Sequence, residues 1–463
     1  MTLPFVLLLG YSAALVALGL YVGRRVRGTS DFFVAGRRLG PGLLGATMLA
    51  ANIGAGSTVG AAGLGYGDGL AAWWWVGSAA IGSLVLAFWI GPRIRTIAER
   101  HDLRTVGDYL AFRYSPIVRT LVAGMLWVGS LAILAGQLIA IASILNVVAG
   151  APKWMGCLVG GALVSAYFTA GGLMTSAWVN LVQLIVKLGG FIVALPLAIA
   201  GAGGMSALTA LSPTPTYWDA WQGGASGWTY LALLGPAFVV SPGLLQKVYG
   251  ARDDRAVRLG VGWNALGLLL YAIVPVLLGM SARARFPDLP SNDLALPWLL
   301  TNGLPPAIGT LGLAAVFSAE VSASDAVLFM LTTSLAQDLY KKVIAPEATD
   351  AAVLRLTRFT AFGAGAVATG LAIASPSVIG VLSIFYTLLS VSLFVPLIMG
   401  LFTARAAPAD AIAAIVAGVT GALAIHLTIG ARGLLTPSIV GLAAAAVAGA
   451  TVFGIRQLGR DAA

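Results

Sequence analysis

Three ionisable side chains, Lys187, Glu320 and Asp325, lie inside long apolar stretches of this 463-residue chain. Ionisable groups within a bilayer are costly and by default indicate a functional site. Lys187 follows Asn180 by seven residues and Gln183 by four, so the three form one polar stripe on a helix. Three interpretations stay open: an ion pair of Lys187 with a carboxylate, carboxylates that bind a cation or a proton, and a lysine that extends to the membrane interface.

The composition is that of an integral membrane protein. Hydrophobic residues make up 59% of the chain and charged residues 10%, against about 25% charged in soluble proteins. Cys157 is the single cysteine, which excludes a disulfide within the chain, and His101 and His426 have no metal-ligating neighbours. We find no nucleotide-binding loop and no nucleophile motif. The sequence therefore predicts neither an enzyme nor a metal site other than one for a coupling ion.

Thirteen apolar runs are long enough to cross about 30 Å of hydrocarbon. They lie near 3–22, 40–66, 68–98, 117–149, 154–170, 173–201, 228–250, 256–281, 306–337, 354–375, 377–402, 408–429 and 434–456. The predicted fold class is an all-α polytopic membrane protein with about 13 transmembrane helices. An odd number of spans places the two termini on opposite sides of the membrane.

Basic residues are distributed unevenly between the two sides. Alternate connections carry most of the 27 lysines and arginines, which indicates that these connections are cytoplasmic. We therefore predict a cell-membrane protein with its N-terminus outside and its C-terminus in the cytoplasm. Because topology accounts for the net charge of +10, we expect membrane lipid and no nucleic acid as a partner, and nothing indicates an obligate protein partner.

Two predicted spans carry helix-weakening residues at their middle. The second reads LAANIGAGSTVGAAGLGYGDG at 49–69, and the seventh reads VVSPGLLQ at 239–246. Glycine costs a helix interior about 1 kcal/mol relative to alanine, and proline more. Glycines could merely allow close helix packing. Interrupted spans at matching positions of two halves, however, are typical of transporters built from inverted repeats, where freed backbone groups bind an ion or solute.

Five segments carry a resemblance to a known family. They are TSDFFVAGRRLGP at 29–41, AANI at 50–53, YFTAGGLMTSAWVNLVQ at 167–183, SPGLLQKVYGARDDRAVRLG at 241–260 and SLAQDLYKK at 334–342. Together they resemble the sodium:solute symporter family. The resemblance implies a LeuT-type fold of five plus five helices in inverted repeat with broken helices. The chain would then be a single transmembrane domain over 1–463, with core repeats at about 40–201 and 228–402. Peripheral helices would cover 3–22, 408–429 and 434–456.

The resemblance also implies a sodium site. Its ligands would be the carbonyls of Ala50, Ile53 and Ala319 and the hydroxyl of Ser322, which suits a hard cation that prefers oxygen. The chain departs from the family at Ala323, where a second hydroxyl is usual. It also has Asn180 for a common aspartate, while Asp325 lies one turn past Ser322 and would assist the ion. Asn180, Lys187 and Glu320 are expected to have auxiliary roles in coupling.

The expected solute site lies between the two interrupted spans. Its predicted residues are Asn52, Gly54, Gly56, Ser57, Trp75, Ser241 and Gly243. Val76 stands where sugar transporters of the family have a glutamate, which disfavours a hexose. The buried carboxylates favour a small organic acid, an amino-acid-like compound or a cationic compound.

The predicted function is therefore sodium-coupled uptake of a small organic solute by alternating access, without covalent chemistry. Coupling to H⁺ is the alternative within transport, favoured by the missing hydroxyl and the buried lysine. A transporter-like sensor and a channel are the alternatives from other classes. The sequence offers no signalling domain for the first and no continuous polar stripe for the second.

Overall fold

The protein is described by a computed structural model covering Gly10, residues 13–14, Ala17, and residues 37–168, 173–211, 213–222, 227–430 and 436–461. Within these ranges the chain is helical, and its only β-type pairing is an isolated bridge between Leu39 and Ala251. The predicted span 3–22 and most of the 29–41 motif lie outside the described residues.

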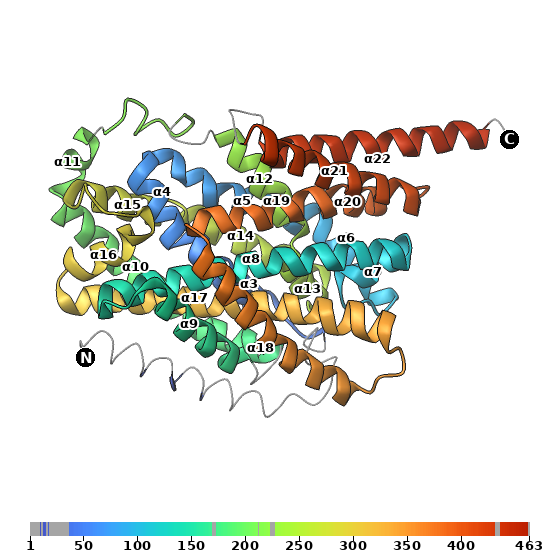
Figure 1. Ribbon diagram of the computed structural model, residues 1–463, viewed down its shortest axis with the longest axis horizontal. Helices are drawn as coiled ribbons and strands as arrows, with labels where there is room; N and C mark the ends of the chain where they lie inside the picture. The colour runs from blue at the N-terminus through green and yellow to red at the C-terminus, as the bar shows by residue number, and fades with distance from the viewer. Residues whose placement is uncertain are drawn as a thin grey trace.

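Long helices run through the bundle and short ones connect them (Figure 1). The first half contains α3 Pro41–Asn52, α4 Val59–Asp68, α5 Trp73–Val85, α6 Gly91–Arg100, α7 Val106–Arg113, α8 Pro116–Ala149, α9 Lys153–Phe168, α10 Leu173–Gly201 and α11 Gly204–Ala210. The second contains α12 Gly227–Val240, α13 Pro242–Tyr249, α14 Asp254–Tyr271, α15 Ile273–Arg285, α16 Ala295–Asn302, α17 Pro306–Thr333, α18 Asp350–Ala374, α19 Val378–Leu389 and α20 Val395–Phe402. Helices α21 Pro408–Thr428 and α22 Pro437–Asp461 follow.

Short 3-10 and π segments join or extend several of these helices. They are η2 Ala55–Ser57, η3 Gly69–Ala72, η4 Leu86–Ile90, η5 Asn292–Leu294, η6 Ser334–Ile344 and η7 Ser390–Phe394. The η4 and η7 π segments continue α5 into α6 and α19 into α20 without ending the helix.

Local sequence sets many helix starts. The Asp253 side chain accepts from the backbone N–H of Ala256 at 2.6 Å and caps α14. Ser115 caps α8 in the same way. Pro116 follows at the first helical position, where an N–H would have no acceptor within the helix, so its absence from proline costs nothing. Gly150, at φ +66°, ends α8 in the left-handed conformation that glycine adopts readily.

Helices distant in sequence lie side by side. Helix α3 packs against α10, α14 and α17, and α8 packs against α17 and α19. Helix α4 contacts α15, and α5 contacts α12. The α21–α22 pair lies at the edge of the bundle, against η7 (Figure 1). The elements of the first predicted repeat are therefore interleaved with those of the second, and both interrupted helices lie in the interior.

Arginines tie several connections together at one end of the bundle. Arg95 donates to the Asp254 carboxylate at 2.9 Å and to the carbonyl of Arg252 at 2.8 Å. Arg113 donates to the carbonyl of Gly400 at 2.8 Å. Arg95 thus joins α6 to the connection between α13 and α14, and Arg113 joins the end of α7 to the end of α20.

The predicted fold class, an all-α polytopic membrane protein, is confirmed. Among the described residues, ten stretches are long and apolar enough to cross a membrane, and α9 is a shorter apolar helix. The predicted spans 40–66 and 68–98 run partly together, because Ala55–Arg100 is one such stretch of 46 residues. The count of thirteen is therefore not confirmed. Helices α7, α11 and α16 occupy connections in which the sequence analysis predicted no element.

Candidate ion and solute sites

At the first interruption, side chains accept the backbone N–H groups that a continuous helix would bond to its own carbonyls. Gly54 N–H donates to the Ser57 hydroxyl at 3.0 Å, and Ala55 N–H donates to Gln137 Oε1 at 2.8 Å. In a continuous helix these two groups would donate to the carbonyls four residues earlier. The carbonyl of Ala50 is therefore released from the helical pattern, and it stays inside the protein.

Lys187, from α10, binds the released carbonyls. Its ammonium donates to Ala50 O at 2.6 Å, to Ile53 O at 3.1 Å and to the Ser322 hydroxyl at 2.8 Å. All four residues are 0% exposed. The lysine thus joins α10 to the end of α3 and to α17, at the place that the resemblance assigns to sodium.

The predicted sodium ligands are brought together, but they surround an ammonium group. The Ser322 hydroxyl lies 3.0 Å from Ala50 O and 3.0 Å from Ala319 O, so it donates to one of them while it accepts from Lys187. Ala323 adds no oxygen. These residues do not fit a sodium ion in this arrangement, because three of the four predicted ligands, all except the Ala319 carbonyl, already accept from Lys187.

Glu320 lies close to the first interruption. Thr58 Oγ1 lies 2.6 Å from Glu320 Oε1 and 3.0 Å from Gly54 O. Among the described residues Glu320 Oε2 has no hydrogen-bond partner, although the side chain is fully buried. Glu320 interacts with Lys187 through charge, but no ion pair within 4 Å joins these two described residues. The interpretation that pairs them directly is therefore not what the structure shows.

A second buried lysine, Lys247, contacts α3 about one helical turn before Ala50. Lys247, on α13, donates to Thr47 O at 3.2 Å, and Asn180 Nδ2 donates to Thr47 Oγ1 at 3.3 Å. Asp325 is 6% exposed and interacts with Lys247 through charge. The predicted polar stripe of α10 is confirmed as buried, because Asn180, Gln183 and Lys187 are each 0% exposed.

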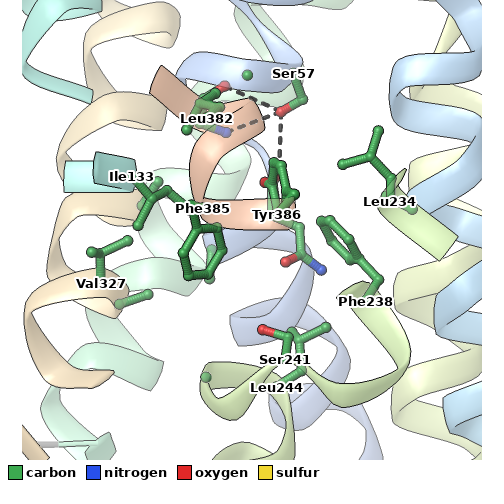
Figure 2. A pocket seen from close by; sticks show the side chains of 18 of the residues that line it. Ser57, Ile133, Leu234, Phe238, Ser241, Leu244, Val327, Leu382, Phe385 and Tyr386 are labelled. Carbon is green, nitrogen blue, oxygen red and sulfur yellow. Dashed lines mark hydrogen bonds between the residues drawn. The ribbon is translucent and has the colours of Figure 1, made fainter. Parts of the chain in front are cut away.

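A cavity opens between the two interrupted helices, and Figure 2 shows part of its wall. Its volume is about 80 Å³, measured as the space that the centre of a water molecule can reach. That is room for several waters or one small solute. Every residue predicted for the solute site lines it: Asn52, Gly54, Gly56, Ser57, Trp75, Ser241 and Gly243.

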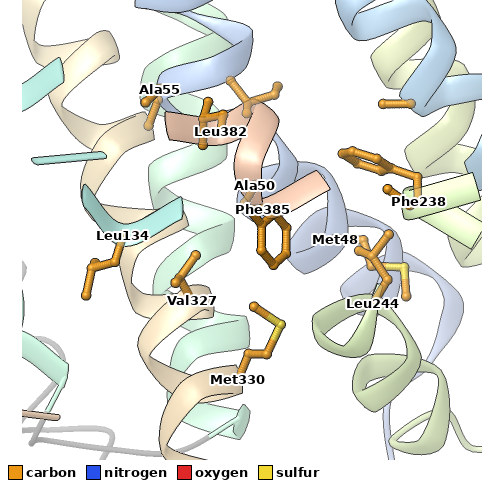
Figure 3. Close-up of a cluster of buried hydrophobic side chains, with 14 of the residues drawn as sticks. Met48, Ala50, Ala55, Leu134, Phe238, Leu244, Val327, Met330, Leu382 and Phe385 are labelled. Carbon is orange, nitrogen blue, oxygen red and sulfur yellow. The ribbon is translucent and has the colours of Figure 1, made fainter. Parts of the chain in front are cut away.

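Aromatic and aliphatic side chains form most of the cavity wall. Trp75 meets Tyr386 edge to face, with ring centroids 6.0 Å apart, and Phe238 lies 5.7 Å from Tyr386. Figure 3 shows Val327 and Met330, from α17, beside Phe385. An apolar wall excludes water, which strengthens the few polar contacts that a solute makes there.

Close packing explains two of the glycines in the first interruption. A Cβ on Gly54 would lie 2.3 Å from the Cβ of Ala323 and 2.9 Å from Gln137 Oε1. A Cβ on Gly56 would lie 2.8 Å from Leu382 Cδ1. The glycines therefore let α8, α17 and α19 approach a backbone that is not helical.

The sequence analysis missed several groups around the cavity. Gln137 is an amide in the middle of the apolar helix α8, and its position 82 residues from Ala55 gave no sign of their contact. Lys247 lies within the motif at 241–260, which was quoted only for its resemblance. Leu382, Phe385 and Tyr386 of α19 have the pattern of ordinary core residues.

Comparison with known proteins identifies the family. The model of the sodium:solute symporter family matches residues 32–418. The chain belongs to the sodium:solute symporter family. The sodium/pantothenate symporter of Escherichia coli is 29% identical over 442 residues, which cover 88% of this chain and 87% of that protein. The sodium/glucose cotransporter of Vibrio parahaemolyticus is 25% identical, over 88% of this chain and 82% of that protein.

A solved structure confirms the fold. A substrate-bound, outward-open Na⁺-coupled sialic acid symporter matches with a TM-score of 0.84 over 98% of each chain. At 18% identity this likeness supports the architecture alone. Membership of the family makes the protein a multi-pass membrane transporter, as the sequence analysis predicted, and not an enzyme.

Proposed function

We propose that the protein carries a small organic solute across the membrane by alternating access, driven by the downhill movement of a cation. The cavity is the observation that carries this proposal, because both interrupted helices contribute to its wall. A site between paired interruptions is reached from either side when one repeat moves against the other. We keep the predicted division into repeats at about 40–201 and 228–402 as part of the proposal.

The solute is proposed to be a small organic acid or an amino-acid-like compound with an apolar part. Lys247 is the one charged residue of the described cavity lining, which also offers Asn52, Ser57, Gln137 and Ser241 as polar groups. Glu320 and Asp325 are not among the lining residues. This arrangement favours an acidic group on the solute and weakens the expectation of a cationic one.

Sodium is the coupling ion that membership of the family supports. A proton is the second candidate, and one observation favours it: an ammonium group stands where the resemblance places sodium. Asp325 remains a proposed ligand that assists the ion, and Glu320 remains a proposed auxiliary group for coupling.

Uptake into proteoliposomes tests the function. Solutes that stabilise the purified protein are offered under a sodium gradient, under a pH gradient without sodium, and with no gradient. We expect accumulation under one gradient. If no stabilising solute accumulates above the level of protein-free liposomes, the proposal is wrong.

The solute class is tested with Lys247→Met. An acidic solute should bind about tenfold more weakly, which corresponds to about 1.4 kcal/mol. Arg258→Met, which removes an exposed cation from α14, is the matched control. If Lys247→Met bound acidic solutes as tightly as the wild type does, the proposal of an acidic solute would be wrong.

The proposed orientation places the N-terminus outside and the C-terminus in the cytoplasm. Gln222→Cys and Glu347→Cys, both at exposed positions, are compared after Cys157→Ala. A membrane-impermeant maleimide added to intact cells should label the first variant only. Labelling of Glu347→Cys alone would show that the orientation is opposite to the proposed one.

A further inference from the structure

We infer that the ammonium group of Lys187 takes the place of the sodium ion between α3 and α17, so that this chain binds no sodium at Ala50, Ile53, Ala319 and Ser322. The inference concerns one site and goes beyond the proposed function. It does not depend on which cation drives transport, because a cation bound elsewhere could still do so.

The hydrogen-bond geometry is the first argument. A lysine ammonium has three N–H donors and no acceptor. Three acceptors lie within 3.1 Å of Lys187 Nζ: the carbonyls of Ala50 and Ile53 and the hydroxyl of Ser322. The number of donors equals the number of acceptors, so the group is satisfied without any further ligand.

The position of the lysine is the second argument. An ion at this place would join the broken end of α3 to α17, and Lys187 makes that same link from α10. The last carbonyls of a helix carry partial negative charge, which attracts a cation. Ala50 and Ile53 lie at this end of α3, so the interruption presents its negative end to a cation that the chain itself supplies.

The charge around the site is the third argument. Lys187 interacts through charge with Glu320 and with Lys247, and Lys247 interacts with Asp325. The cluster thus contains two lysines and two carboxylates among the described residues. A sodium ion at the same carbonyls would add a third positive charge within a few ångströms of Lys187, in a site closed to water. Like charges in such surroundings repel strongly.

Ala323 agrees with this assignment. The family usually has a second hydroxyl there, and an ion that prefers many oxygen ligands would lose one. An ammonium needs three acceptors and already has them. The departure at Ala323 and the presence of Lys187 are therefore explained together.

Sodium binding to the purified protein tests the inference. Binding of ²²Na⁺ and the thermal midpoint are measured in sodium chloride and in N-methylglucamine chloride at equal ionic strength. The wild type and Ser322→Ala should respond alike to sodium, because the hydroxyl holds no ion. A saturable response in the wild type that is lost in Ser322→Ala would overturn the inference.

Removal of the lysine is the complementary test. Lys187→Ala combined with Ala323→Ser clears the site and restores the second hydroxyl, so its thermal midpoint should rise with the logarithm of the sodium concentration. Lys247→Ala is the matched control, since it removes a buried lysine that also donates to an α3 carbonyl, and it should gain no response. A folded double variant without any sodium response would count against the assignment.

If the double variant does not fold, the comparison of the wild type with Ser322→Ala decides alone. The proposed function fails by a different result, the absence of solute accumulation under every gradient. Solute uptake driven by sodium, with no response at Ser322, would support both proposals.

Discussion

The two interrupted helices of this protein are built in different ways. The break between α3 and α4 spans six residues, 53–58, and polar groups from other parts of the structure hold it open. Gln137 comes from α8, Lys187 from α10 and Glu320 from α17. The break between α12 and α13 is one residue, Ser241, followed by Pro242 at the first helical position.

The difference shows two ways to expose backbone inside a membrane. At the second break Pro242 has no N–H, so it leaves no donor without an acceptor. The amides of Leu244 and Leu245 both donate to Ser241 O, at 3.1 and 2.9 Å. The break is thus encoded locally. At the first break each freed group needs a partner, because an unsatisfied polar group in hydrocarbon costs several kcal/mol. Function is therefore more sensitive to distant substitutions at the first break than at the second.

The largest difference is expected between Gly54→Ala and Gly243→Ala. The Cβ added at Gly54 would lie 2.3 Å from the Cβ of Ala323, whereas the one added at Gly243 would meet nothing within 4 Å. Overpacking at Gly54 should cost about 3 kcal/mol and abolish uptake. Gly243→Ala should leave the thermal midpoint unchanged or raise it, since alanine favours a helix by about 1 kcal/mol. Equal thermal midpoints for the two variants would contradict the comparison.

Gln137→Leu tests the support of the first break from α8. The Ala55 N–H would lose its acceptor inside the protein, which should lower the free energy of unfolding by about 2 kcal/mol. Thermal unfolding in nanodiscs measures the change. Leu138→Met, a swap of similar volume one position along the same helix, is the control and should cost less than about 1.5 kcal/mol. A Gln137→Leu protein as stable as the wild type would show that the break holds itself open.

Ser57→Ala and Ser241→Ala compare the two breaks directly. Ser57 accepts from Gly54 N–H and lies 2.9 Å from Asn52 O, so its loss should cost about 1 kcal/mol. Ser241 makes no side-chain cap to its helix, and its loss should stay within about 0.5 kcal/mol. Chemical denaturation of both variants in the same detergent gives the difference. A larger loss at Ser241 would reverse the order of the two breaks.

Pro242→Ala is expected to have the smallest effect. Proline at the first helical position fixes a dihedral angle that is already helical, so alanine should change stability by less than about 1 kcal/mol. Uptake should persist, because the Ser241 backbone stays non-helical at ψ 118°. Loss of uptake with unchanged stability would indicate that the proline alone keeps α12 and α13 apart.

The same comparison explains what the sequence could predict. Glycines mark the first break and Pro242 with Gly243 marks the second, which is why all seven expected solute-site residues, from Asn52 to Gly243, could be placed at the cavity that they line. The burial of Lys187 was also foreseen. Its partners were not, because backbone carbonyls have no signature in a sequence, and a carboxylate is the obvious partner for a buried lysine. Gln137 was missed because a side-chain amide inside an apolar helix does not show which distant backbone N–H it will bind.

The isolated bridge between Leu39 and Ala251 has a mechanical consequence. Leu39 N–H donates to Gly250 O and Arg252 N–H donates to Leu39 O, both at 3.0 Å, which fastens the entry to α3 onto the exit from α13. Helix α3, which precedes the first interruption, and α13, which follows the second, are thus joined at the ends that lie away from the interruptions. A tilt of α13 must drag the start of α3 with it unless both bonds break. The bridge therefore couples the movement of α3 to that of α13, and bending at the interruptions leaves the bridge intact.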